Sequence, residues 1–127
     1  MSAIEIEVNG AADDQRRYDR TARAALAAAG VDDGHLAIDF VDADAIRALN
    51  RDYRALDKPT DVLSFPIDGD GPAPGPRELG DIVICAEYTQ DLDEAVVHGV
   101  LHLCGYDHET DAGEMLELQD RIMDGLR

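Results

Sequence analysis

The sequence predicts a single domain in which strands and helices are mixed, and three observations support this fold class. Its 127 residues lie within the size range of one domain and suffice to bury roughly two-thirds of the unfolded chain's surface. Segments with strand-like alternation and segments with helical periodicity follow one another along the chain. No internal repeat is visible. We therefore expect one domain that spans residues 1–127.

The first half of the chain contains two predicted strands, residues 4–8 and residues 36–41. Residues 14–29 between them have helical periodicity, and the glycine that follows marks the end of this helix. A second helix is expected to begin after Asp42 or Asp44, because either side chain can cap it. The apolar faces comprise Tyr18, Ala22, Ala25, Leu26 and Ala29 in the first helix and Ile46, Leu49 and Tyr53 in the second.

The second half begins with a predicted strand at residues 61–65, which a proline closes, and continues with another at residues 81–85. Residues 68–78 between them are rich in glycine and proline, so we expect a mobile loop there. After a short helical segment, residues 92–103 and residues 111–126 are predicted helices. The last helix should bury a stripe formed by Met115, Leu118, Ile122 and Leu126.

The charge of the chain is unusual, since 28 acidic residues stand against 11 basic ones, for a net charge of −17. One explanation is that the protein does not bind nucleic acid, because its surface repels polyanions. The other is adaptation to concentrated salt, where the Debye length falls to about 3 Å. Composition favours the second explanation, because aspartates are spread along the whole chain instead of forming an acidic tail.

Cysteine usage and hydropathy bear on the cellular compartment. The two cysteines, Cys85 and Cys104, both have apolar neighbours and do not form a disulfide framework, which is consistent with a reducing environment. The N-terminal residues lack the basic and apolar regions of a secretion leader, and no apolar run approaches the length of a membrane span. We therefore expect a cytoplasmic protein that does not contact a membrane.

Three of the four histidines lie within eleven residues, in a pattern that predicts a metal site. His98 and His102 are four residues apart, so on a helix both rings project from one face. Gly105 is expected to stop that helix and to let the chain turn back, so that His108 supplies a third nitrogen. Three protein ligands leave a fourth position open, which is typical of catalytic zinc. His35 is isolated in a strand and is expected to be satisfied by hydrogen bonds alone.

Several neighbouring residues leave alternatives open. The usual metalloprotease motif has a glutamate after its first histidine, where this chain has Gly99, so the base for peptide hydrolysis is missing. Cys104 should point away from both helical histidines and belong to the core. Asp107 either orients a metal ligand or stabilises the turn. Glu94 could reach metal-bound water, although a solvated or ligand-orienting carboxylate is the more common role.

A stripe of basic residues on the first predicted helix also has two interpretations. Arg16, Arg20 and Arg23 lie opposite its apolar face. A solvated helix face is the more common outcome for such a stripe. The alternative is a surface that contacts phosphates.

Three segments together carry a resemblance to a known family. They are residues 98–108, which contain the histidines, residues 49–66 and residues 79–84. This combination resembles the YbeY family of bacterial metal-dependent endoribonucleases and ribosomal RNA maturation factors. The resemblance implies an α+β fold with a small mixed sheet packed against helices and a zinc ion held by the three histidines. It also implies a catalytic role for Arg54 across the cleft, and the stretch between Cys85 and His98 is shorter than the family pattern leads us to expect.

The function implied by this resemblance is zinc-dependent, single-strand-specific cleavage of RNA in ribosomal RNA maturation and ribosome quality control. Expected partners are ribosomal RNA and the ribosome or its proteins. Imidazole ligands suit nickel and other divalent metals as well as zinc. One alternative is a ribosome-associated binding protein whose metal only holds the fold. Another is a metallohydrolase with a different substrate class. The nucleophile is open between an activated water and a ribose 2′-hydroxyl.

Overall fold

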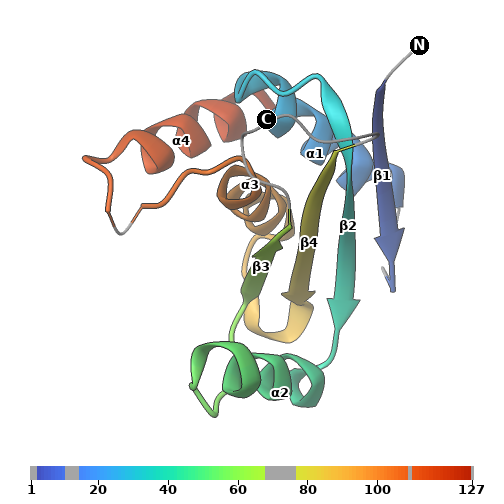
Figure 1. The fold of residues 1–127 in the computed structure, drawn as a ribbon, viewed down its shortest axis with the longest axis vertical. Coiled ribbons are helices and arrows are strands. Elements are labelled where there is room, and N and C mark those ends of the chain that lie inside the picture. The colour runs from blue at the N-terminus through green and yellow to red at the C-terminus, as the bar shows by residue number, and fades with distance from the viewer. Residues whose placement is uncertain (1–2, 11–14, 68–76, 109, 127) are drawn as a thin grey trace.

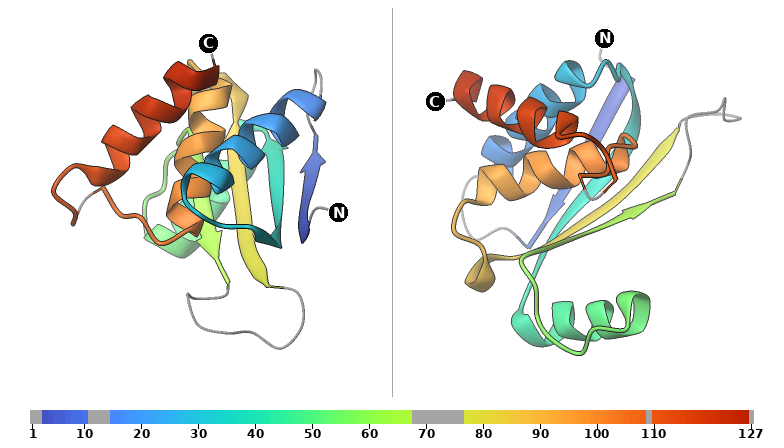
Figure 2. Two further views of the ribbon diagram at one scale, coloured as in Figure 1. Left: turned by 90° about the horizontal axis from the view of Figure 1, so that it is seen from above. Right: turned by 90° about the vertical axis from the view of Figure 1, so that its left-hand side faces the viewer.

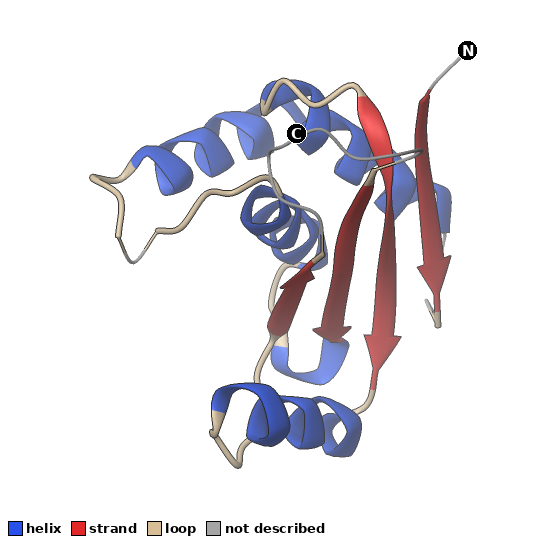
Figure 3. Cartoon of the chain, viewed as in Figure 1, coloured by secondary structure: helices blue, strands red, loops and turns tan. Residues whose placement is uncertain are grey.

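A computed structural model describes residues 3–10, 15–67, 77–108 and 110–126 (Figures 1 and 3). The elements in chain order are β1 (Ala3–Asn9), α1 (Gln15–Ala28), β2 (Asp33–Val41), α2 (Ala43–Arg54), β3 (Val62–Pro66), β4 (Glu78–Cys85), the short 3₁₀ helix η1 (Ala86–Tyr88), α3 (Leu92–Leu103) and α4 (Glu114–Leu126).

The four strands form one mixed sheet in the order β1-β2-β4-β3. β1 pairs with β2 and β2 with β4 in parallel, whereas β3 runs antiparallel to β4. Helices α1, α3 and α4 lie on one side of this sheet, and α2 lies on the other side at one end (Figure 2). The predicted single-domain α+β fold with a small mixed sheet is therefore confirmed.

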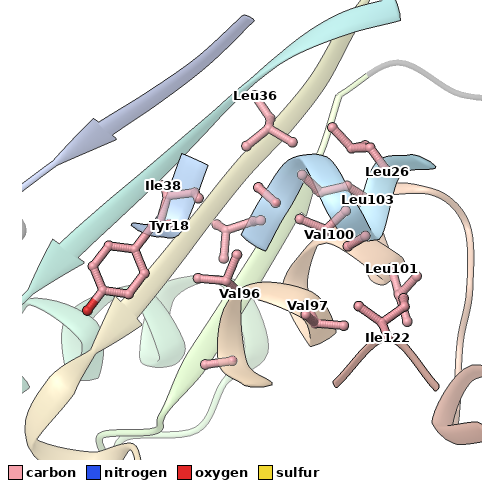
Figure 4. Packing of buried hydrophobic residues seen from close by; sticks show 14 of the residues in the cluster. Tyr18, Leu26, Leu36, Ile38, Val96, Val97, Val100, Leu101, Leu103 and Ile122 are labelled. Carbon is pink, nitrogen blue, oxygen red and sulfur yellow. The ribbon is translucent and has the colours of Figure 1, made fainter. Parts of the chain in front are cut away.

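The main core lies between the sheet and the three helices (Figure 4). It confirms the predicted helix faces, since Tyr18 and Leu26 of α1 and Met115 of α4 are fully buried. α3 is buried on most of its circumference, because it packs against the sheet on one side and against α1 and α4 on the others. The metal-site helix is thereby held in the middle of the molecule.

Gly99 lets α3 approach the sheet closely. A Cβ atom at this position would lie 2.6 Å from Cγ2 of Ile82 on β4, closer than real side chains come. The Ser64 hydroxyl of β3 also donates a hydrogen bond to the Gly99 carbonyl oxygen, at 3.4 Å. Position 99 therefore faces the sheet and has no room for the glutamate of a metalloprotease motif.

The opposite face of the sheet is covered at one end by α2, around a second cluster of Ile46, Leu63, Val83 and Cys85. Asp42 caps α2, accepting a hydrogen bond from the Ala45 N–H at 2.8 Å, which decides between the two predicted caps. The prediction that Tyr53 belongs to the apolar stripe is wrong. Its side chain is 69% exposed and touches only the edge of the cluster through Phe65, because α2 extends beyond the sheet there.

Other predicted boundaries need small corrections. β4 begins three residues earlier than predicted, and α4 begins at Glu114 because Asp111 accepts hydrogen bonds from the N–H groups of Gly113 and Met115 instead of entering the helix. Of the predicted mobile loop at 68–78, residues 68–76 lie outside the described part of the chain. Neither cysteine forms a disulfide among the described residues; Cys85 is buried and Cys104 partly buried.

The arginine stripe of α1 follows its more common interpretation. Arg23 pairs with Asp19 at 2.7 Å and donates to the Ile4 carbonyl oxygen, while Arg16 and Arg20 are exposed. None of the three lines the cleft described below.

Candidate metal centre

A glycine turn at the end of α3 brings the third histidine back to the first two. The N–H of Gly105 donates to the His102 carbonyl oxygen and that of Tyr106 to the Leu101 carbonyl oxygen, which is the hydrogen-bond pattern of a Schellman motif. Gly105 has φ +99°, a conformation that side chains with a Cβ rarely adopt. The predicted stop at Gly105 is therefore confirmed, and the turn leads directly to His108.

The three predicted histidines lie together. Each of His98, His102 and His108 offers one ring nitrogen to a group whose ligand atoms lie within 4.8 Å of one another. The ring centroids are 4.7 to 5.4 Å apart. The Nε2 atoms of His98 and His102 are 3.1 Å apart, close to the roughly 3.3–3.4 Å between neighbouring nitrogens of a tetrahedral zinc site with bonds of about 2.0–2.1 Å. This group could hold one metal ion.

Two hydrogen bonds determine the tautomers of the helical histidines. His98 Nδ1 lies 2.9 Å from Oε1 of Gln119 on α4, and His102 Nδ1 lies 3.0 Å from the Tyr106 carbonyl oxygen. Both oxygens can only accept, so each Nδ1 must carry the hydrogen. In the neutral rings both Nε2 atoms then present lone pairs to each other, an arrangement that a shared cation stabilises.

The surroundings of the histidine group favour a neutral His102 ring and leave one nitrogen of His108 without a hydrogen-bond partner among the described residues. Burial lowers the pKa of His102 below its ordinary value, and repulsion from His98 adds to this effect. Neutral imidazole is the form that binds metal. Nδ1 of His108 is buried and has no hydrogen-bond partner among the described residues. The ligand set therefore fits a divalent metal that prefers nitrogen, of which zinc is the most common in proteins.

His35 lies elsewhere, on the sheet between two glutamates. Its Nδ1 is 2.9 Å from Glu78 and its Nε2 is 3.4 Å from Glu7. The hydrogen bond with Glu78 raises the pKa of His35. This histidine is satisfied by polar partners, as expected, and takes no part in the histidine group.

The histidine group lines a cleft of about 1020 Å³ between α3, α4, β3 and the end of α2. Arg54, the last residue of α2, lines the same cleft from the side of that helix. Among the described residues, no hydrogen bond or ion pair engages its guanidinium group. The buried Asn50 side chain donates to the Lys58 carbonyl oxygen at 2.9 Å and thereby fastens the loop that follows Arg54. The cleft thus combines a metal-binding group with an available arginine.

The other two predicted site residues also reach the cleft. Glu94 lines it from α3, one turn before His98, and is exposed. Asp107 lines it from the turn, and its backbone carbonyl accepts hydrogen bonds from the N–H groups of Thr110 and Asp111. The negative charge of Asp107 raises the pKa of His102, but this effect is weaker than the lowering caused by burial. The Asp107 backbone therefore helps to close the turn, and both proposed roles of its side chain remain predictions.

Sequence reasoning missed two residues of the cleft. Gln119 is 6% exposed and lies within the apolar stripe of α4, so a polar residue at a core position of a helix was the available signal. Tyr88 on η1 is 54% exposed in the cleft and had no periodic signal, because η1 is only three residues long.

Comparison with known proteins identifies the family. The family model described as Endoribonuclease YbeY matches residues 4–127. The chain belongs to the YbeY family. The resemblance of the three motif segments is thereby confirmed, as is the expectation of a metal-dependent endoribonuclease at the level of the family. None of the described helices is both long and apolar enough to cross a membrane.

Individual relatives agree with this assignment. Endoribonuclease YbeY of Persephonella marina is 40% identical over 112 residues, which cover 76% of this chain and 73% of that protein. The corresponding protein of Rhodopseudomonas palustris is 44% identical over 126 residues, covering 83% and 65%. That of Halorhodospira halophila is 47% identical over 103 residues, covering 69% and 67%.

A solved structure has a similar fold. The solution structure of TM1509 from Thermotoga maritima superposes with a TM-score of 0.58 at 26% identity, over 94% of this chain and 87% of that one.

Proposed function

We propose that this YbeY-family protein is a zinc-dependent endoribonuclease that cleaves single-stranded RNA and acts in ribosomal RNA maturation and ribosome quality control in the cytoplasm. The observation that carries the proposal is that one cleft is lined by a three-histidine group and by Arg54, whose guanidinium group has no partner within the described part of the chain. Phosphodiester cleavage needs charge stabilisation on both sides of the phosphate, and this cleft offers both.

Each side chain of the cleft has its own role in the proposed reaction. The Arg54 guanidinium grips two phosphoryl oxygens and neutralises charge that grows in the transition state. The three imidazoles, in their neutral form, would hold the metal, and Gln119 and the Tyr106 carbonyl orient two of the rings. A bound zinc ion would supply Lewis-acid polarisation of a phosphoryl oxygen or a lowered pKa of water. If a water is the nucleophile, Glu94 would be a candidate to accept its proton; otherwise Glu94 is a solvated or ligand-orienting carboxylate, and the ribose 2′-hydroxyl is the alternative nucleophile.

The acidity of the chain is compatible with an RNA substrate if the protein works in concentrated salt. At about 1 M salt the Debye length is near 3 Å, so repulsion between distant carboxylates and RNA phosphates is largely screened. Direct contacts at Arg54 and the metal are screened much less.

The central test compares arginine variants of the zinc-loaded protein. Arg54→Ala should keep the metal and the fold but lose about 2.7–4 kcal/mol of transition-state stabilisation, which is roughly a hundredfold to a thousandfold in rate. Arg54→Lys should recover only part of this loss, because an ammonium lacks the planar fork. Arg51→Ala is the matched control, since Arg51 lies on the same helix, is exposed and does not line the cleft.

The measurement is cleavage of a single-stranded RNA at equal zinc content and equal salt. Unchanged cleavage by Arg54→Ala would refute the role of this arginine. His98→Ala, His102→Ala and His108→Ala should each lower metal content and activity together, whereas full metal occupancy in any of them would remove that residue from the site. Failure of the fully loaded wild type to cleave free or ribosome-bound RNA would instead support a binding protein with a structural metal.

A further inference from the structure

The six phenylalanine and tyrosine rings of the chain have different surroundings, and one of them is available in the cleft. Tyr18 is buried against Phe40, whereas Tyr106 lines the cleft but is partly buried against the main core. Tyr53 is exposed but lies outside the cleft, in contact with Phe65. Tyr88 is both exposed, at 54%, and part of the cleft wall that the histidines line. A flat π surface is therefore presented in the same cleft as the metal-binding group.

The charges of the cleft are unfavourable for a polyanion. Among the described lining residues, Arg54 is the only arginine or lysine, whereas the carboxylates are Asp61, Asp91, Glu94 and Asp107. Proteins that hold RNA by its phosphates use several basic side chains and bind weakly in high salt. One arginine does not provide such a surface, so beyond the phosphate held by Arg54 and the metal, the described cleft needs contacts to other parts of the RNA.

We infer that Tyr88 stacks on a nucleobase of single-stranded RNA, next to the phosphate that Arg54 and the metal engage; this inference rests on the proposed function. Stacking on an aromatic ring is tolerant of sequence and is insensitive to salt. It requires a base whose face is free, so it selects unpaired RNA over a duplex. Leu116 of α4, 45% exposed in the same cleft, provides a second apolar surface for bases.

The cleft has the size that this arrangement needs. Its volume of about 1020 Å³ is at the upper end of the roughly 300–1,000 Å³ range of pockets that enclose a drug-sized ligand. A nucleotide is of that size class, so a base at Tyr88 and the adjoining phosphate at the metal fit together. Tyr88 is thus assigned as a substrate-binding residue of the cleft.

The chain contains no tryptophan, so a single introduced one reports on its own surroundings. In zinc-loaded Tyr88→Trp, a short single-stranded 2′-O-methyl RNA should quench the tryptophan fluorescence, because the indole stacks on a base. The same oligonucleotide made of abasic units should quench little. Tyr53→Trp is the matched control and should respond to neither. Equal quenching by intact and abasic strands, or no quenching in Tyr88→Trp, would overturn the inference.

Affinity provides a second measurement that does not depend on a fluorophore. Loss of a stacked base typically weakens binding roughly 5- to 150-fold, so Tyr88→Leu should lose affinity by that factor. Tyr88→Phe keeps the ring and should recover most of this loss, while the control Tyr53→Leu should bind as the wild type does. The slope of log K against log salt should be no steeper than about −2, since each phosphate contact to a single strand contributes only about −0.7. Wild-type affinity in Tyr88→Leu, or a much steeper slope, would refute the inference.

These binding results are separable from the proposed function. If Tyr88→Leu binds and cleaves as the wild type does while Arg54→Ala is inactive, the stacking inference fails and the endoribonuclease stands. If base-dependent quenching and the loss of affinity are seen but neither the wild type nor any variant cleaves RNA, the proposed function fails and Tyr88 remains a base-binding residue.

Discussion

Gln119 offers the sharpest test of how the fold prepares the metal centre. Its Oε1 accepts the hydrogen bond from His98 Nδ1 at 2.9 Å, and the side chain is 6% exposed. Gln119→Leu keeps the approximate volume and suits the surrounding core but removes the acceptor. The His98 ring then keeps a buried N–H without a partner, or rotates and loses the orientation of Nε2 toward His102. Either result weakens metal binding.

The expected loss of metal affinity can be worked out from the single hydrogen bond between His98 and Gln119. Leaving one buried donor unsatisfied costs about 1–3 kcal/mol. Loss of a group that orients a ligating histidine typically lowers metal affinity about 10- to 100-fold, which is roughly 1.4–2.7 kcal/mol, so the two figures agree. Gln119→Glu should retain or increase the affinity, because a carboxylate is a stronger acceptor for the same N–H.

The assay is competition for zinc between the protein and a chromophoric chelator of known affinity, at fixed pH and salt. Gln90→Leu is the matched control, because Gln90 lines the same cleft but is exposed. Thermal melts of the metal-free proteins exclude a general loss of stability, since leucine in this apolar stripe should not lower the melting temperature. Unchanged zinc affinity in Gln119→Leu would show that the His98–Gln119 bond does not prepare the site.

Two further predictions concern stability. Glu78 raises the folded-state pKa of His35 above 6.5. The contribution of protonated His35 to the free energy of unfolding is therefore fully present below pH 6.5 and is lost as the pH rises through the raised pKa. In zinc-saturated protein, the difference in unfolding free energy between wild type and His35→Gln should therefore shrink as the pH rises from below 6.5 through the raised pKa of His35, and a constant difference would contradict this. Thermal melts should also show a melting temperature that rises with salt up to about 1 M, as screening weakens repulsion within a chain of net charge −17; a flat or falling series would leave the acidity unexplained.

The sequence by itself determined the elements and the grouping of the three histidines, because both depend on local spacing. Periodicity located the buried faces of α1 and α4, and α3 has the predicted bounds. The four-residue spacing of His98 and His102 and the stop at Gly105 are likewise short-range, so the cluster could be predicted before any contact was known. The functional role of Arg54 was predicted only from the family resemblance, because an arginine at the end of a helix is common and does not by itself indicate a site.

Only the tertiary structure decided which distant side chains meet at the cleft. Gln119 lies 21 residues after His98 and reaches it because α4 packs against α3, and Tyr88 faces the cleft because η1 turns the chain between β4 and α3. The exposure of Tyr53 likewise depends on how far α2 extends beyond the sheet. Such long-range contacts depend on how whole helices and strands pack against one another. Side-chain periodicity predicts which face of an element is buried, but it does not predict which residues of another element that face contacts.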